Sequence, residues 1–335
     1  MSSLTTPAAE LGDANDQRPA LAWWKWGHVA NWQDKQVGQN GLPITFESWS
    51  MPVWDGATTA RRVRLWPNPA VWDEPSRWQS IGQWPVLLPW GTRFRAGVGT
   101  DSACIVDHGD ISYEVQNLRM AGPFEAIALA VRTRGAYRPG DYLCDLVHRV
   151  TSGCLDEEKH LAGALGKVRD REGLLSAEQA ANGVTTALAM GTFNAQFGPP
   201  TMAFPPRFVP PATRIEHINL NQRPQWLPAG DDQRMIPRGT RFRLSMTDRE
   251  IDEWAMSRHD GTKSITAVII ATGLRDYGWF DSLTVSAGPY LQATGVLNPA
   301  ERAVWADVGL KTERDFRTLL DKLFTPTNIK VVRAA

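Results

Sequence analysis

Tryptophan recurs at a constant interval of six residues in a proline-rich stretch of the chain. The five positions are Trp66, Trp72, Trp78, Trp84 and Trp90, with Pro67, Pro69, Pro75, Pro85 and Pro89 among them. Because proline removes a helical hydrogen bond and clashes with the preceding turn, this stretch is predicted to be extended. Six is a multiple of the strand period and of the polyproline period, so the five indoles could share one side. They form either a ladder of binding anchors or a set of core residues that each fill a separate gap.

A seven-residue motif occurs twice in the chain. Residues 89–95 read PWGTRFR and residues 237–243 read PRGTRFR, which leaves six of seven positions identical. A turn at the glycine followed by alternating residues predicts a strand in each copy, with Phe94 and Phe242 pointing inward and the arginines outward. We expect the two copies to be equivalent strands of one pseudo-symmetric sandwich. The arginines could hold carboxylate or uronate groups, or cover sheet edges, and they are Arg93, Arg95, Arg241 and Arg243.

Capping signals predict several helices among further strands. A cap residue followed three positions later by an acid or glutamine begins a helix, and such starts are Ser176, Thr247, Asn298 and Thr312. An apolar run over residues 264–277 predicts a buried helix that ends at Gly278. Strands are predicted over residues 103–106, 111–118, 126–132, 184–193 and 329–332.

Together these patterns predict a mainly β fold, a jelly-roll-like β-sandwich with peripheral helices. The 15 tryptophans and 23 prolines favour such a turn-rich architecture. The expected segments are a flexible arm over residues 1–20, an extended docking segment over 21–84, the sandwich over 85–295, and C-terminal helices with a short strand over 296–335.

The charge balance excludes two classes of partner. Lys and Arg number 36, as do Asp and Glu, so the broad basic field that nonspecific nucleic-acid or membrane binding requires is missing. The first 20 residues have no basic stretch followed by an apolar one, so we expect no secretory signal. Cys104, Cys144 and Cys154 lack zinc-ligand spacing and are expected to be buried thiols. No cofactor or metal is predicted.

The catalytic motifs that are recognisable by spacing do not occur in the sequence. It contains no nucleophile elbow, P-loop, dinucleotide-binding turn or His-Glu-x-x-His helix. The best acid or base candidates are Asp107, His108 and Asp110, in which a histidine lies between two carboxylates. The same residues are also typical of an ordinary turn, and we favour that interpretation. We therefore expect a protein without enzymatic activity.

Several segments resemble one family. They are residues 89–95, residues 173–183 followed by 186–188, and residues 237–244 followed by 265–280, of which residues 271–278 are the most specific. The chain resembles, over roughly residues 85–290, large β-rich secreted proteins of actinobacteria with polysaccharide-related function, and similar domains of minor tail proteins from phages of these bacteria. It departs from them in its Trp-rich front, in its missing signal peptide, and in having Val184 to Leu188 where the family has Asp-His-Ala-Leu.

The resemblance and the indole-rich front predict a phage minor tail protein. Such a protein is made in the host cytoplasm, is localised in the virion, and docks as an oligomer to other virion subunits. A host cell-wall polysaccharide is the second expected partner, with the five spaced tryptophans and the four motif arginines as binding residues. The alternatives are an enzyme that degrades cell-wall polysaccharide, a glycoside hydrolase or lyase, and a lectin-like bacterial protein.

Overall fold

The computed structural model describes a little over half of the chain in two compact units. The described residues are 5–21, 23–24, 42–47, 50, 52–55, 62–67, 85–87, 104–107, 112–116, 119–128, 130–134, 173–193, 236, 239–285 and 290–333. Unit 1 combines residues 1–45, 163–293 and 303–335, and unit 2 combines residues 46–162 and 294–302. Both units are discontinuous in sequence, and the four predicted segments stay a prediction.

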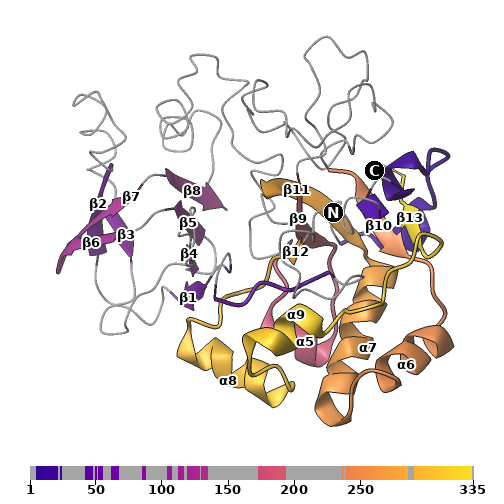
Figure 1. Ribbon diagram of the computed structural model, residues 1–335. Coiled ribbons are helices and arrows are strands. Elements are labelled where there is room, and N and C mark those ends of the chain that lie inside the picture. Colours follow the sequence, from indigo (N-terminus) through magenta and orange to yellow (C-terminus); the bar gives the residue numbers. More distant parts are fainter. Residues whose placement is uncertain are drawn as a thin grey trace, which may run out of the picture. The chain divides into compact units, whose positions relative to one another are not determined.

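Unit 1 is built on a five-stranded mixed sheet (Figure 1). Its strands, in spatial order, are β12 (Tyr290–Leu291), β9 (Leu188–Phe193), β11 (Trp279–Val285), β10 (Arg241–Leu244) and β13 (Ile329–Val331). The pair β9 and β11 is parallel, and the other three pairs are antiparallel. The predicted strands at residues 184–193 and 329–332 are confirmed as β9 and β13.

Helix α6 (Asp248–Met256) begins where its capping signal predicts. The Thr247 hydroxyl accepts a hydrogen bond from the Glu250 amide, and the Glu250 carboxylate accepts one from the Thr247 amide. This reciprocal pair satisfies amides that a helix start leaves without a partner. One face of the helix is buried, as the spacing predicts, through Ile251, Trp254 and Ala255.

Helix α7 (Gly261–Asp276) is the longest described element of unit 1 and packs against β10, α5 and α6. It ends at Gly278 as predicted, where φ is +78° and a Cβ atom would collide with the carbonyl oxygen of Phe242. Gly273 faces Val184 so closely that any side chain would displace it. The two glycines therefore set how near α7 lies to its neighbours.

The remaining helices also begin at their predicted caps. Helix α5 (Ala177–Asn182) begins after Ser176, α8 (Pro299–Asp307) after Asn298, and α9 (Glu313–Thr318) after Thr312. Helical residues for which no helix was predicted are the single turn α1 (Ala8–Leu11) and residues 18–21 and 23–24. No helix among the described residues combines the length and apolarity that crossing a lipid bilayer requires.

Unit 2 contains two four-stranded sheets. The first has the order β1 (Val53–Asp55), β4 (Cys104–Asp107), β5 (Ser112–Gln116) and β8 (Ala130–Arg134). The second has the order β3 (Pro85–Leu87), β2 (Arg62–Pro67), β7 (Glu125–Ala128) and β6 (Arg119–Gly122). The predicted strand at 126–132 is divided between β7 and β8.

The front segment contributes two of these strands. Strand β1 pairs in parallel with β4, and β2 pairs in parallel with β7. Both β1 and β2 lie within residues 21–84, which we expected to be a docking segment. At these positions the segment is extended, as predicted, and its backbone groups bond within unit 2.

The core of unit 1 is rich in aromatic residues. Phe242 is fully buried, as predicted for the motif, and stacks on Trp279 with ring centroids 5.8 Å apart. Trp279 also meets the edge of Phe324 at 5.3 Å, and Trp305 meets Phe316 at 5.0 Å. These rings come from strands, helices and loops, so the core joins all three.

The prediction of a mainly β sandwich is wrong. From Arg241 to Val331 the described elements are four helices of 9, 16, 9 and 6 residues and four strands of 7 residues or fewer. Helix α7 is not peripheral, because it packs against β10 and buries Ile270, Ala271 and Leu274. The proline-rich front favours extended structure, and we applied the same expectation to a region whose strong caps indicate helices. The first motif copy lies outside the described residues, so the equivalence of the two copies stays a prediction.

Candidate functional site

Most of the predicted site residues lie outside the described residues. They are His108, Asp110, Trp72, Trp78, Trp84, Trp90, Arg93 and Arg95. Asp107 ends strand β4 opposite Ser112, and Trp66 lies in strand β2. Strands β4 and β5 are antiparallel neighbours, and residues 108–111 between them, where we predicted a turn, lie outside the described residues. The structure brings Arg241 and Arg243 together with a distant part of the chain.

Arg241 is buried, in contrast to the outward orientation that we predicted. Its Nε donates to the carbonyl oxygen of Tyr277 at 2.7 Å, and its Nη2 donates to the carbonyl oxygen of Thr6 at 2.6 Å. Burial lowers the pKa of this guanidinium to about 10. The side chain therefore stays charged at neutral pH and joins the end of α7 to the N-terminal residues. The alternating pattern failed here because two carbonyl groups supply the partners that allow an arginine to be buried.

Arg243 lies two residues further along β10 and binds the same N-terminal stretch. Its Nε donates to the Asp13 carboxylate at 2.8 Å, and the side chains are 22% and 40% exposed. This pair is accessible to solvent, so its electrostatic contribution is screened. The two motif arginines thus differ in burial although both contact residues 5–13.

The same stretch also covers the edge of the sheet beside β13. The amide of Ala14 donates to the Val331 carbonyl at 2.8 Å, and the amide of Arg333 donates to the Gly12 carbonyl at 3.0 Å. The Gln17 side chain accepts from the Val331 amide at 2.8 Å and donates to its carbonyl at 3.1 Å. We call residues 5–24 the edge-cover segment. It overlaps residues 1–20, which we expected to be a flexible arm.

Trp23 anchors the edge-cover segment in the aromatic core. The side chain is 4% exposed, and its ring centroid lies 5.4 Å from that of Trp279 and 5.2 Å from that of Phe324. Its Nε1 donates to the Met190 sulfur at 3.1 Å. At this position an indole of the front region is core. Trp54 is likewise buried, whereas the role of the five spaced tryptophans stays a prediction.

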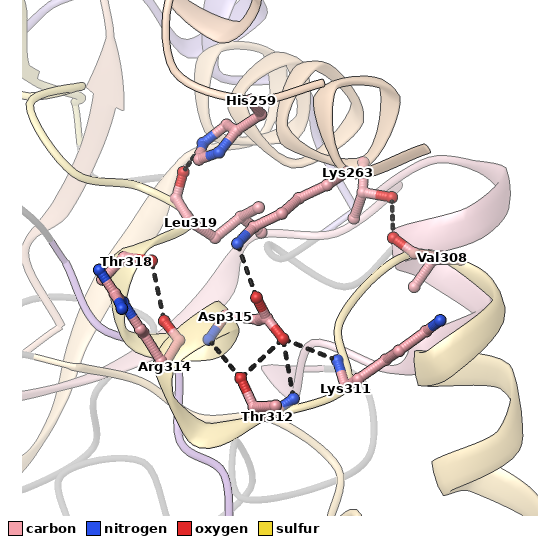
Figure 2. A network of polar contacts seen from close by, with 10 residues as sticks. His259, Lys263, Val308, Lys311, Thr312, Arg314, Asp315, Thr318 and Leu319 are labelled. Carbon is pink, nitrogen blue, oxygen red and sulfur yellow. Dashed lines mark hydrogen bonds and ion pairs between the residues drawn. The ribbon is translucent and has the colours of Figure 1, made fainter. Parts of the chain in front are cut away.

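A second polar cluster fastens α9 to the start of α7 (Figure 2). The Lys263 ammonium group contacts the Asp315 carboxylate at 2.8 Å, and both side chains are 23% exposed. Asp315 also accepts from the Thr312 amide and hydroxyl at 2.8 Å and from the Lys311 amide at 3.1 Å. Burial opposes ionisation, yet the bonds from Lys263, Thr312 and Lys311 hold the pKa of Asp315 below its ordinary range. The carboxylate therefore acts as a helix cap.

Two further side chains complete this cluster. The Nε2 atom of His259 lies 2.9 Å from the Leu319 carbonyl, and the Thr266 hydroxyl donates to the Val308 carbonyl at 2.7 Å. Burial lowers the pKa of His259, and the charges of Lys263 and Arg258 act in the same direction. The neutral ring with a proton on Nε2 is therefore favoured at neutral pH. Each of these groups holds a backbone carbonyl at the end of a helix or loop.

Neither cluster provides a metal centre. Among the residues that the structure describes, no group of three or more His, Cys, Asp or Glu side chains could hold a metal ion. Sequence reasoning identified the two motif arginines but missed Asp13, Gln17 and Trp23. No local signal could have revealed these three, because their partners are more than 160 positions away.

Comparison with protein-family models, with curated proteins and with solved structures found no match.

Proposed function

We propose that this chain is a structural component of a phage virion, a minor tail protein that docks to other tail subunits. The resemblance of residues 237–244 and 265–280 to domains of phage minor tail proteins supports the class of protein. The indole-rich front region supports docking, because buried tryptophans anchor protein interfaces at low entropic cost.

The observation that carries the proposal is the way in which Arg241 is used. Its guanidinium holds two backbone carbonyl groups from separate segments, and neighbouring Arg243 holds Asp13. Main-chain carbonyls are available on any polypeptide, so these contacts are those of a motif that fixes chain segments in place. A uronate-binding arginine would instead need its donors directed at solvent. The described motif copy therefore favours a structural role over glycan recognition.

Incorporation into particles tests this proposal. Virions purified by density gradient from a lysate of the phage that carries the gene should contain the chain, and mass spectrometry of isolated tails should detect it there. A chain found only in the soluble fraction, while other tail proteins are found in the particles, would contradict the proposal. Arg241→Ala should lower incorporation, whereas Arg18→Ala, at a side chain that is 62% exposed, should leave it unchanged.

Host cell-wall polysaccharide is the second proposed partner. This part rests on the five spaced tryptophans, since an indole face stacks on the apolar face of a sugar ring. A sedimentation assay with purified host cell walls tests it. Replacing Trp72 and Trp78 by alanine should reduce the bound fraction, and equal binding of the variant would contradict the glycan contact.

A further inference from the structure

We propose that the edge-cover segment exchanges between copies of this chain, so that residues 5–24 of one copy occupy the β13 edge and the Trp23 site of a neighbour. This inference concerns contacts between identical chains and does not depend on a role in a virion.

The edge-cover segment is separable from the unit that it covers. Within it, the described contacts are all short-range: the helical turn α1, helical residues 18–21 and 23–24, the exposed pair of Arg18 and Asp16, and a bond from the Gln17 side chain to the Ala14 carbonyl. Its other polar contacts join it to residues far away in sequence, from 167 positions for Met190 to 320 positions for Arg333. Because its internal contacts are short-range, the path of the segment is set by the surface that it meets. It behaves as a bound peptide that is covalently attached.

The surface that it covers suits the addition of an extended chain. Strand β13 is the last strand of its sheet, and its far side would present bare amides and carbonyls. The Gln17 side chain accepts from the Val331 amide, and the Ala14 amide donates to the Val331 carbonyl. Asp13 and Val332 form an antiparallel bridge. Such addition of a strand to a sheet edge is a recurring mode of peptide recognition.

A second copy is the occupant that fits this surface best. If the edge were open, three sites would lose their partners together. They are the buried guanidinium of Arg241, the Val331 backbone, and the space among the core aromatic rings that Trp23 occupies. Another copy of residues 5–24 supplies all three complements, with an aspartate at position 13 for Arg243. Exchange therefore preserves every contact, which makes it a low-cost route to association.

The connection that follows the segment is long enough for the exchange. Residues 25–41 lie between Trp24 and the next attachment, where the Ile44 amide donates to the Phe316 carbonyl at 3.1 Å. At full extension a stretch of this length reaches roughly 60 Å, which exceeds the width of a small domain. The same connection also lets the segment cover the edge of its own copy. Exchange must compete with this intramolecular binding, whose effective concentration is in the millimolar range.

Mixed cysteine variants of the full chain test the exchange. One variant carries Asp13→Cys and the other Val332→Cys. The two new cysteines are on different chains, so they are neighbours only when the edge-cover segment of one copy lies on the β13 edge of the other. Antiparallel partners lie within the distance that a disulfide spans. The two variants are mixed in denaturant, refolded together at increasing concentration and oxidised. Mass spectrometry then identifies the joined peptides, which separates them from products of the three native cysteines.

The proposal expects a mixed dimer joined through positions 13 and 332, with a yield that rises with protein concentration. Glu178→Cys mixed with Val332→Cys is the control, because Glu178 is exposed on α5 outside the covered edge, and it should give no such dimer. Folded variants that give no 13–332 product at any concentration would overturn the proposal.

A second pair guards against a variant that does not fold. Ala14→Cys and Val331→Cys place sulfur atoms at residues joined by the 2.8 Å hydrogen bond, and the same two outcomes apply. The unmodified chain provides an independent measurement. Refolded at high concentration it should give a dimer by light scattering, and a chain that stays monomeric throughout would also overturn the exchange.

Discussion

The edge-cover segment and helices α6 to α9 reach their structures by opposite routes. Helices α6, α8 and α9 have local signals that fix where they begin, such as the Thr247 and Glu250 pair and the Thr312 and Asp315 pair, and α7 has one where it ends, at Gly278. The edge-cover segment has only short helical stretches, at residues 8–11, 18–21 and 23–24, and its order depends on β10, β13 and the aromatic core. Residues with strong local signals were predicted correctly, while the segment without them was expected to be a flexible arm.

This difference implies a difference in what a mutation can damage. A lost cap removes hydrogen bonds from one helix end, and the packed face of that helix still holds it in place. A lost anchor of the edge-cover segment releases many contacts together, because the segment has little structure of its own. The largest effects should therefore lie at Trp23 and Arg241 and the smaller ones at the caps.

Trp23→Ala should cause the largest loss, since it empties an indole-sized space among Phe242, Trp279 and Phe324. Truncating a buried aromatic residue to alanine costs about 3–5 kcal/mol. Urea unfolding of the full chain measures it. Leu21→Ala, at a side chain that is 47% exposed, is the control and should change the free energy of unfolding by less than about 0.5 kcal/mol. Equal effects at the two positions would mean that Trp23 is not an anchor.

Arg241→Ala should be the next most damaging, because it leaves the carbonyls of Thr6 and Tyr277 without their charged donor. Hydrogen bonds to charged groups contribute about 1.5–3 kcal/mol, so we expect a loss of about 2–3 kcal/mol in the free energy of unfolding. Arg243→Ala provides a matched comparison from the same strand. Its exposed pair with Asp13 should contribute less than about 1 kcal/mol. A larger effect at Arg243 than at Arg241 would contradict the assignment of the buried residue as the main clamp.

Thr312→Ala tests the local side of the comparison. Removing the hydroxyl takes away the acceptor for the Asp315 amide and one donor to the Asp315 carboxylate. Loss of such a cap costs about 1 kcal/mol. Thr318→Ala, whose hydroxyl donates to the Arg314 carbonyl within the same helix, should cost less because it is not a cap. If thermal unfolding gives the reverse order, the capping box does not stabilise α9.

The smallest effect should come from His259 and should depend on pH. Because the pKa of His259 in the folded chain lies below 6.5, the unfolded chain takes up a proton first as the pH falls. The histidine therefore contributes stability above pH 6.5 that is lost below it. His259→Gln keeps a donor for the Leu319 carbonyl but does not titrate. The stability of the natural chain should fall relative to this variant as the pH drops below 6.5, and parallel pH profiles would contradict the lowered pKa.

The sequence predicted the helices of this protein better than its sheet. Caps at Ser176, Thr247 and Thr312 and the terminator at Gly278 act within a few residues, so their signals are visible in the sequence. The parallel pairing of β9 with β11 joins residues about 90 positions apart, and no local pattern specifies it. The predicted sandwich failed at this level, because alternation identifies strands but does not identify their neighbours.

The candidate site was predicted in part for the same reason. The repeated motif marked Arg241 and Arg243, and Phe242 is buried as its alternation required. Each arginine has a partner in residues 6–13, which have no charge or hydrophobic pattern that marks them as a ligand. An outward arginine and an arginine that binds buried carbonyls look the same in an alternating strand.

Hydrogen–deuterium exchange on the full chain tests most directly whether the edge-cover segment is an integral part of unit 1. The amides of Ala14 and Val331 are hydrogen-bonded across the edge, at 2.8 Å in each case. We predict that they exchange as slowly as the amides in the middle of α7, since both belong to one cooperative unit. Exchange of these two amides at the rate of exposed groups, while α7 stays protected, would contradict the account.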